Sequence, residues 1–431
     1  MIEHSGHPII VPPSVVSCGT TQVPDNTASS ELAEAPAKTR RETEKVGAVV
    51  VGGDYQGLGI VRSLGRHGIP VCIVDDEASS ARFSRYCTKF VSVDSLRDER
   101  TTVDALLKLG KQFNLGGWIL YPTRDELVAA FSRHRSELEQ IFRVPTPVWS
   151  SVKWAWDKRN THKLALELDI PTPFTIYPQN VEELSELGSR LPPFAIKPAI
   201  KEHFVYATKA KAWCANSPAE VKSMFEKAVI LAGSGEVMIQ ELIPGGGSQQ
   251  FAYCAFFREG QAIGKMVVRR RRQHPLQFGR ASTYVETVDI PILEELSERF
   301  LKAINYYGLV ELEYKLDPRD SQYKLLDVNA RTWGYHSLGT QVGTDFSYML
   351  YLDQLGLPVT PHKAPAGAAW VRMITDVPTA FLEFIAGDLD LKSYVRSLKN
   401  CNVDAVFSVE DPLPGLVEVL LVPYLALRRG F

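Results

Sequence analysis

The segment GLVELEYKLDPRDSQYKLLDVNARTWG constrains the fold more than any other part of the chain. Polar and apolar residues alternate along VELEYKL, and an acid, an amide and a guanidinium stand at Asp327, Asn329 and Arg331. Such alternation predicts strands with one polar and one apolar face, and DPRDSQ between them is typical of a turn. We therefore expect a β-hairpin, in which Glu313 lies opposite Asp327 if the turn centres near Asp320.

We expect a cation at the polar face of this hairpin, because directly opposed carboxylates repel each other unless a positive charge lies between them. The oxygen atoms of the two acids and of Asn329 suit Mg²⁺, which usually also contacts nucleotide phosphates. Arg331, next on that face, could hold a transferring phosphate through two hydrogen bonds. The alternative is a solvated polar face that Lys315 and Lys324 partly neutralise.

Two further segments are compatible with a nucleotide site. Lys197 stands inside the apolar strand candidate FAIKP, where a lysine needs an anionic partner or a route to solvent. A phosphate fits, and a side chain that reaches solvent is the alternative. The strand candidate in MIQELIPGG ends at Gln240 and Glu241 and could present a purine with backbone groups and a carboxylate; the glycines could equally serve only a turn.

Residues 46 to about 150 read as alternating strands and helices. The segment VGAVVVGGDYQGLGIVRSLGRHGIPVCIVDDE is typical of a strand, a Gly-rich turn, a helix and a second strand that ends at Asp75. Ligands of open α/β sheets bind at that end of the strands. GGDYQGLG does not match GxGxxG, so a dinucleotide site and a purely structural turn both stay open.

Composition narrows the classes of function. A chain of 431 residues predicts two or three domains, and its formal net charge of -2 gives no basic field that would favour nucleic acid. The six cysteines are scattered without zinc spacing, which fits a reducing, cytoplasmic compartment. Residues Thr21 to Glu44 are rich in Ala, Thr, Ser, Pro and Glu, and the first 45 residues are expected to be a disordered tail.

The C-terminal segment GLVEVLLVPYLALRRGF is apolar but too short to span a bilayer, and Glu418 and Pro423 interrupt it. It predicts a helix that packs on the core. A membrane-surface anchor is the alternative.

The order of these pieces resembles the ATP-grasp superfamily, in particular carboxylate–amine ligases similar to D-aspartate ligase and to the carbamoyl-phosphate synthetase large chain. The series is Asp157-Lys158, a strand lysine, QELIPGG, an acid on a strand, and then acid-x-Asn-x-Arg. The resemblance covers about residues 46–431, and the hairpin is its most specific motif. RRRRQHPLQFG and WVRMITDVP also resemble one subgroup of these ligases.

The resemblance implies an α/β and α+β protein: an ATP-grasp fold with an N-terminal Rossmann-like pre-ATP-grasp domain. The expected parts are the tail (1–45), the Rossmann-like domain (46–150), the ATP-grasp small or lid subdomain (151–235), and the large subdomain with a C-terminal extension (236–431).

The resemblance also implies roles for single residues. The positions expected to bind ATP are Lys158, Lys197, Lys211, Gln240, Glu241, Ile243 and Gln249. The positions expected to bind Mg²⁺ are Glu313, Asp327 and Asn329. The catalytic positions expected near the transferring phosphate are Arg272 and Arg331. The strand ends expected to help hold a carboxylate substrate are Gly53, Asp54, Asp75, Thr123 and Asp125, although Asp125 could instead cap the helix DELVAAF.

Three positions depart from the family pattern. Asp327 stands where the family usually has Glu and is one methylene shorter, which favours one metal ion over two. Gln249 lacks the acid that usually contacts the ribose, and Ala330 replaces a proline.

The function that the resemblance implies is an ATP-dependent ligase that joins a carboxylate to an amine through an acylphosphate and releases ADP and phosphate. Its expected partners are small-molecule carboxylate and amine substrates, with amino acids first among them, and a second copy of the chain in a homodimer. Nucleic acid and a membrane span are not expected. The alternatives are a non-catalytic ATP-binding regulatory protein and a nicotinamide-dependent oxidoreductase.

Overall fold

The computed structural model describes residues 45–429 apart from 201–207, 209, 211, 234, 277, 278 and 280, and it describes side chains as far as residue 426. The tail expected over residues 1–45 therefore lies outside the described residues except for Lys45. The same holds for Lys211, one of the positions expected to bind ATP.

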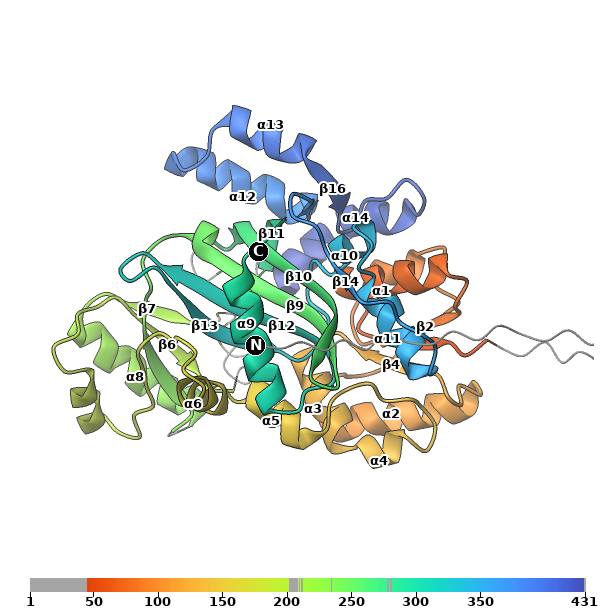
Figure 1. The fold of residues 1–431 in the computed structure, drawn as a ribbon, viewed down its shortest axis with the longest axis horizontal. Helices are drawn as coiled ribbons and strands as arrows, with labels where there is room; N and C mark the ends of the chain where they lie inside the picture. The colour runs from red at the N-terminus through yellow and green to blue at the C-terminus, as the bar shows by residue number, and fades with distance from the viewer. Residues whose placement is uncertain are drawn as a thin grey trace, which may run out of the picture. The chain divides into compact units, whose positions relative to one another are not determined.

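The N-terminal part is a parallel sheet in the order β3-β2-β1-β4 (Figure 1). Its strands are β1 (Ala48–Val51), β2 (Val71–Asp75), β3 (Lys89–Ser92) and β4 (Ile119–Pro122). Its helices are α1 (Tyr55–Arg66), η1 (Ala81–Phe83), α2 (Glu99–Gln112), α3 (Asp125–Arg133) and α4 (Arg135–Leu138). Gly52 turns the chain after β1 with a φ of 97°, and Asp54 caps α1 by accepting from the backbone N–H of Gln56. The expected strand, Gly-rich turn, helix and strand are confirmed.

An antiparallel sheet in the order β5-β8-β6-β7 follows, and α8 packs on it. Its elements are β5 (Thr175–Ile176), η2 (Glu182–Leu187), β6 (Phe194–Pro198), β7 (Trp213–Ala215), α8 (Pro218–Ala232) and β8 (Val237–Glu241). The helices α5 (Trp149–Trp156) and α6 (Lys158–Glu167) precede it, and Asp157 caps α6. This sheet presents Lys197 on β6 and Gln240 on β8. The boundaries expected between the domains stay a prediction.

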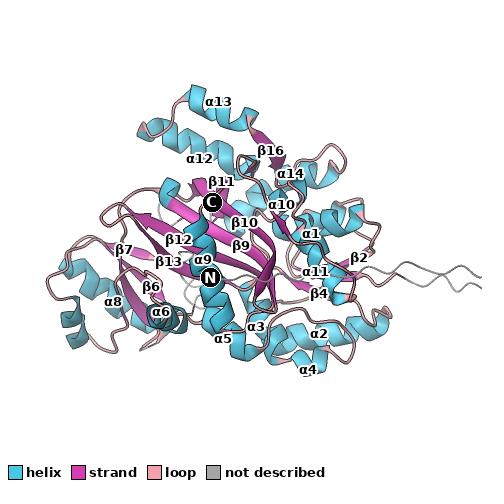
Figure 2. Cartoon of the chain, in the orientation of Figure 1, coloured by secondary structure: helices cyan, strands magenta, loops and turns pink. Residues whose placement is uncertain are grey.

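The large sheet runs in the order β13-β12-β9-β10-β11-β15-β16, with β14 beside β10 (Figure 2). Its strands are β9 (Gln250–Arg258), β10 (Gln261–His274), β11 (Ala281–Val288), β12 (Gly308–Asp317), β13 (Gln322–Asn329), β14 (His362–Lys363), β15 (Ala369–Val371) and β16 (Cys401–Asp404). A short 3₁₀ helix, η3 (Gly247–Gln249), precedes β9. The hairpin turn between β9 and β10 lies at Glu259 and Gly260, both with positive φ.

Alternate residues of β9 enter two different hydrophobic cores. Tyr253 and Phe257 pack with α9 (Pro291–Ala303) on one face, whereas Cys254 and Phe256 pack toward the parallel sheet on the other. The helices α10 (Ser337–Gln341) and α11 (Phe346–Gln354) contribute to this second core. Successive side chains of a strand point to opposite faces of the sheet. β9 can therefore contribute to two cores because other elements cover both faces of the sheet at this strand.

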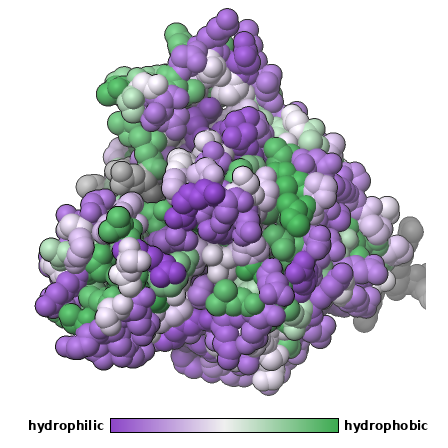
Figure 3. All heavy atoms as spheres, turned by 60° about the vertical axis from the view of Figure 1, so that its left-hand side comes forward, coloured by the Kyte–Doolittle hydropathy of each residue, from purple (hydrophilic) through white to green (hydrophobic). Residues whose placement is uncertain are grey.

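The C-terminal extension contains α12 (Met373–Ala386), α13 (Leu391–Lys399) and α14 (Leu413–Arg429). The expectation that the last helix packs its apolar side chains on the core is largely wrong, because Leu416 and Leu420 are 62% and 79% exposed. Apolar side chains also gather over α12 and α13, in the upper part of Figure 3. Among the described residues, none of the helices has the length and apolar character that crossing a membrane requires.

Candidate active site

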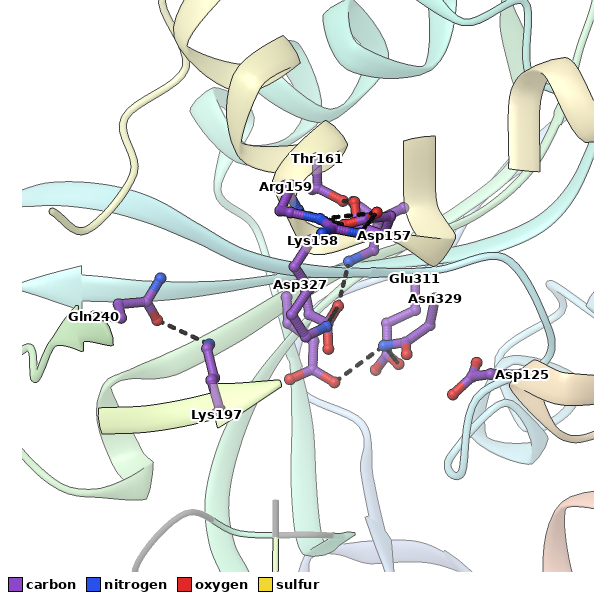
Figure 4. A network of polar contacts seen from close by, with 12 residues as sticks. Asp125, Asp157, Lys158, Arg159, Thr161, Lys197, Gln240, Glu311, Asp327 and Asn329 are labelled. Atoms are coloured by element: carbon purple, nitrogen blue, oxygen red, sulfur yellow. Dashed lines mark hydrogen bonds and ion pairs between the residues drawn. The ribbon is translucent and has the colours of Figure 1, made fainter. Parts of the chain in front are cut away.

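The hairpin of β12 and β13 has the register that the sequence predicted. Glu313 pairs directly with Asp327, and Glu311 pairs with Asn329 two residues further along the strands. Figure 4 shows Glu311, Asp327 and Asn329 close together. The expected opposition of two carboxylates is therefore confirmed, and the sequence analysis left the third acid, Glu311, without a role.

The acid cluster, defined here as Glu311, Glu313, Asp327 and Asn329, is not a solvated polar face. Glu311 and Asn329 are 4% and 3% exposed. The Asn329 amide donates to Glu311 Oε2 at 3.0 Å and to Glu313 Oε1 at 3.2 Å, and the Tyr335 hydroxyl donates to Glu311. Burial, reinforced by the charge of Glu313, raises the pKa of Glu311. The alternative of a solvated face is wrong.

Cations from distant segments of the chain form ion pairs with the cluster. The Lys158 ammonium forms an ion pair with Asp327 (Figure 4), and Arg270 Nη2 lies 3.6 Å from Glu313 Oε2. Lys158 is the first residue of α6, so the helix that follows the capping residue Asp157 delivers it to the cluster. The structure thus brings Lys158 to the predicted metal ligands.

Lys315 and Lys324, which the sequence offered as neutralising residues, point elsewhere. Lys315 Nζ donates to the carbonyl oxygens of Ile243 at 2.8 Å and Gly245 at 2.7 Å. Lys324 Nζ forms a 2.6 Å ion pair with Asp317. Both lysines sit beyond the bulge between Glu313 and Tyr314, and they support the strand ends and loop.

Arg331 is held by an acid from the Rossmann-like part of the chain. Its Nε lies 2.7 Å from Asp125 Oδ1 and its Nη2 3.3 Å from Asp125 Oδ2, and Nη2 also donates to Asn329 Oδ1 at 3.3 Å. Asp125 is the first residue of α3 and Arg124 stands at the cap position, so the carboxylate serves Arg331 rather than a helix cap. Asp125 thereby fixes the guanidinium beside the acid cluster.

A cavity of about 590 Å³ lies between the antiparallel sheet and the large sheet. It has the size of small-molecule sites. The residues that line it include Lys197, Gln240, Glu241, Leu242, Ile243, Pro244, Gln250, Gln273 and Lys315. Of the predicted ATP-binding positions, Lys197, Gln240, Glu241 and Ile243 thus share one cavity. Gln249 is not among the described lining residues, whereas its neighbour Gln250 is.

Hydrogen bonds orient the cavity's polar side chains. Lys197 Nζ donates to Gln240 Oε1 at 2.9 Å (Figure 4), and Gln240 Nε2 donates to Thr175 Oγ1 at 2.8 Å. Because Lys197 is turned into the cavity, it is placed to meet an anion there.

Glu241 is committed to protein groups. Its Oε1 accepts from the Phe174 backbone N–H at 3.0 Å, and its Oε2 lies 2.9 Å from Arg319 Nη2. The carboxylate therefore fixes the strand end, which leaves the backbone of residues 241–243 to line the cavity.

Arg270 connects this cavity with the acid cluster. It donates to Gln250 and, at 3.2 Å, to Gln273 Oε1, both on the cavity wall, while its Nη2 faces Glu313. The sequence analysis missed Arg270 and chose Arg272 two residues later. The four-arginine run was the only sequence signal for it.

The structure does not bring Arg272 to the acid cluster. Its guanidinium makes two 2.8 Å hydrogen bonds to Asp376 of α12 and lies 4.3 Å from the centre of the Tyr284 ring. The pair is buried, with the two side chains 5% and 0% exposed. Arg272 therefore attaches the C-terminal extension to the large sheet.

The donor set is chemically suited to Mg²⁺. In the described part of the chain, no three His, Cys, Asp or Glu residues are placed together to hold a metal ion. The site instead offers two facing carboxylates and one amide oxygen, a hard oxygen set that suits an ion sharing its shell with phosphate and water. The Asp327 carboxylate carries the Lys158 ammonium as its counter-charge.

Near the Gly-rich turn, Asp75 is the acid that a dinucleotide site would use, and its carboxylate is hydrogen-bonded to groups of the protein itself. Asp75 Oδ2 accepts from the Gly53 backbone N–H at 2.8 Å, and Asp75 Oδ1 lies 3.0 Å from Arg124 Nη2. These contacts give the acid a structural role and weaken the oxidoreductase alternative.

Comparisons with known proteins show which sequences and which folds this chain resembles. No family model matches the chain. The chain is similar to D-aspartate ligase of Enterococcus faecium, with 23% identity over 311 residues that cover 67% of this chain and 72% of that protein. The expected resemblance is thus confirmed.

Solved structures share the fold. L-amino acid ligase from Bacillus licheniformis superposes with a TM-score of 0.56 at 13% identity, covering 72% of this chain and 74% of that one. The biotin carboxylase domain of 2-oxoglutarate carboxylase from Hydrogenobacter thermophilus, solved with MgADP and bicarbonate, gives a TM-score of 0.60 at 14% identity over 75% and 73% of the chains. The predicted ATP-grasp fold is confirmed.

Proposed function

We propose that this protein is an ATP-dependent carboxylate–amine ligase of the ATP-grasp type, which forms an amide or peptide bond through an acylphosphate and releases ADP and phosphate. One observation carries the proposal. Two facing carboxylates, Glu313 and Asp327, lie beside a cavity of about 590 Å³, and Arg270 contacts both the cluster and the cavity wall. The relationship to D-aspartate ligase supports the same activity.

The cavity is the place for the nucleotide in this proposal. Residues 241–243 and the Gln240 side chain line it and would form the wall beside the adenine, while Lys197 would meet a phosphate. Glu313, Asp327 and Asn329 would hold Mg²⁺, which supplies charge neutralisation at the phosphates. Gln249, expected near the ribose, stays a prediction without a contact to the cavity.

The transfer step needs positioned cations more than a protein nucleophile. Arg331, fixed by Asp125, orients the phosphoryl group as it moves to the substrate carboxylate. Lys158, now paired with Asp327, would be free to contact the phosphates if that carboxylate held Mg²⁺. The amine then displaces phosphate from the acyl group. The chain requires no Ser or Cys nucleophile for either step.

The substrates proposed are a small carboxylate and an amine, with amino acids as the first candidates because the named relative is D-aspartate ligase. The cytoplasm is proposed as the compartment, which the scattered cysteines support. A homodimer is proposed on the resemblance alone.

The direct test measures ADP and phosphate release from MgATP with pooled carboxylic acids against pooled amines. Release that requires both pools is the expected result, and division of the pools then identifies the substrates. ADP release with acids alone would instead indicate an acyl kinase. An absence of ATP binding would refute the proposal.

A matched pair of variants separates the ligase from a non-catalytic ATP-binding protein. Asp327→Ala should abolish turnover, because it removes one of the two facing carboxylates. Asp320→Ala alters an acid at the exposed tip of the same hairpin and should keep turnover. Full activity in a folded Asp327→Ala variant would contradict the metal assignment.

A further inference from the structure

The C-terminal extension turns its apolar side chains outward. More than half of the large apolar side chains that are exposed in the described residues lie between Val377 and Tyr424. In Figure 3, part of this surface forms the hydrophobic area over α12 and α13. A large group of exposed apolar side chains on one part of the surface is typical of a site of interaction.

The exposed face of α12 is wholly apolar. The residues of α12 classed as exposed are Val377, Pro378, Phe381, Leu382, Ile385 and Ala386. Its two acids turn away from this face: Asp376 is fully buried against Arg272, and Glu383 is half-buried. A helix that faced water would show the opposite arrangement.

The helix α14 repeats this inverted arrangement. Its exposed residues in the described side chains are Leu413, Leu416, Val419, Leu420, Pro423 and Tyr424. Glu418, the charged residue among the described side chains of α14, is turned inward. Its Oε1 lies 2.6 Å from Arg372 Nη2, and its Oε2 accepts a 2.7 Å hydrogen bond from Ser80 Oγ. Both helices therefore place charge toward the protein and apolar atoms toward the outside.

The helix α13 supplies positive charge beside the α12 face. Lys392, Arg396 and Lys399 recur at i, i+4 and i+7, so they form one stripe on an exposed side of the helix. Leu391 and Val395, 68% and 42% exposed, lie next to that stripe. The helix contains no acid.

The helices α12 and α13 pack together through their inner sides. The Phe384 and Tyr394 rings meet edge to face at 5.6 Å. The nearby exposed acids lie in the connecting loop, where Asp390 caps α13 by accepting from Ser393, and Asp388 stands beside it. The apolar face and the basic stripe thus belong to one helical hairpin.

We propose that the α12–α13 hairpin, with α14, binds the surface of an anionic lipid bilayer. The apolar face of α12 enters the boundary between head groups and acyl chains, and the basic stripe of α13 meets lipid phosphates. The long stems of Lys392, Arg396 and Lys399 allow their charges to stay at the head-group level.

A lipid surface fits these helices better than a second copy of the chain. A two-fold contact would bring two basic stripes toward each other while the acids of α12 and α14 remain buried in their own subunit. Protein interfaces also carry about one hydrogen bond per 100–200 Å², whereas the outward face of α12 offers no polar side chain. The hydrocarbon chains of a lipid bilayer form no hydrogen bonds, so a face without polar side chains suits them.

The test uses the full chain and sedimentation with vesicles. Vesicles of phosphatidylcholine with about 30% phosphatidylserine should bind the protein, and vesicles of phosphatidylcholine alone should bind it about tenfold less strongly. Binding should weaken as salt rises, because the Debye length shortens.

Variants assign the binding to this surface. Phe381→Ser with Ile385→Ser should weaken binding about tenfold or more, since it removes apolar area that would enter the bilayer. Lys392→Gln with Arg396→Gln should abolish the preference for anionic lipid. The matched control, Ile230→Ser with Leu231→Ser on α8, replaces exposed apolar residues outside the extension and should bind as the wild type does.

Each contrary outcome overturns the proposal. These are an absence of binding to anionic vesicles, equal loss of binding in the Ile230/Leu231 control, and unchanged binding in a folded Phe381/Ile385 variant. A concentration-dependent dimer that the Phe381/Ile385 substitutions dissociate, with no vesicle binding, would assign the face to a second copy. Circular dichroism and thermal unfolding establish that the variants are folded.

Discussion

The pair between Asp125 and Arg331 gives the sharpest test of how the Rossmann-like part positions the reacting groups. Asp125→Ala leaves the Arg331 guanidinium, 14% exposed, with its main charged partner removed. Opposite charges about 4 Å apart attract by about 4 kcal/mol at an effective dielectric constant of 20. Because the Asp125 side chain is 23% exposed, water replaces part of this attraction. We expect a loss of about 2–3 kcal/mol in the free energy of unfolding.

The assay is urea unfolding at pH 7 of the wild type, Asp125→Ala, Arg331→Met and the double variant. Removal of both charges should cost less than the sum of the single losses, by about 2 kcal/mol, because the double variant buries no unpaired guanidinium. Additive losses, or a loss below about 0.5 kcal/mol in Asp125→Ala, would refute the reasoning that Asp125 anchors Arg331.

Three further predictions concern separate groups. Lys197→Met should weaken ATP binding about tenfold in a calorimetric titration, because a charge-assisted hydrogen bond to phosphate is lost. Arg270→Gln should lower ADP release about tenfold or more, whereas Arg272→Gln should mainly lower the free energy of unfolding, by about 3 kcal/mol; the reverse pattern would restore Arg272 to the active site. Hydrogen bonds from Arg319 and other neighbours lower the pKa of Asp317, so its carboxylate stabilises the fold above its unfolded pKa of about 3.9 and ceases to do so as the pH falls through the lower folded value. Asp317→Asn should therefore be less stable than the wild type at pH 7, and urea unfolding should show the difference shrinking below about pH 4.

The register of the β12–β13 hairpin could be predicted because its causes are local. Alternation fixes which side chains share a face, and the turn residues fix which positions oppose each other, so Glu313 and Asp327 follow from a short segment. The cations that neutralise the acids could not be predicted in this way. Lys158 lies 169 residues from Asp327 in sequence, and it reaches the cluster only because α6 begins there.

The choice between Arg270 and Arg272 shows a different limit. In a regular strand, residues two apart share a face, so sequence alone cannot separate them. The pairing of β10 with β11 shifts register between Arg270 and Arg272 and again before Gln273. An irregularity of this kind redirects side chains, and the two arginines diverge toward Glu313 and Asp376. No residue in the four-arginine run signals the shift.

The orientation of the last helices follows from ion pairs rather than from apolar packing. An amphipathic pattern states that a helix has two faces but does not state which one meets the protein. In α12 and α14 the inward face carries the acid, and Asp376 and Glu418 are each buried against an arginine, Arg272 and Arg372. Buried ion pairs contribute little net stability but are costly to break one partner at a time. They therefore fix which face turns inward and leave the apolar face outside, where only a contact with lipid or another apolar surface would remove it from water.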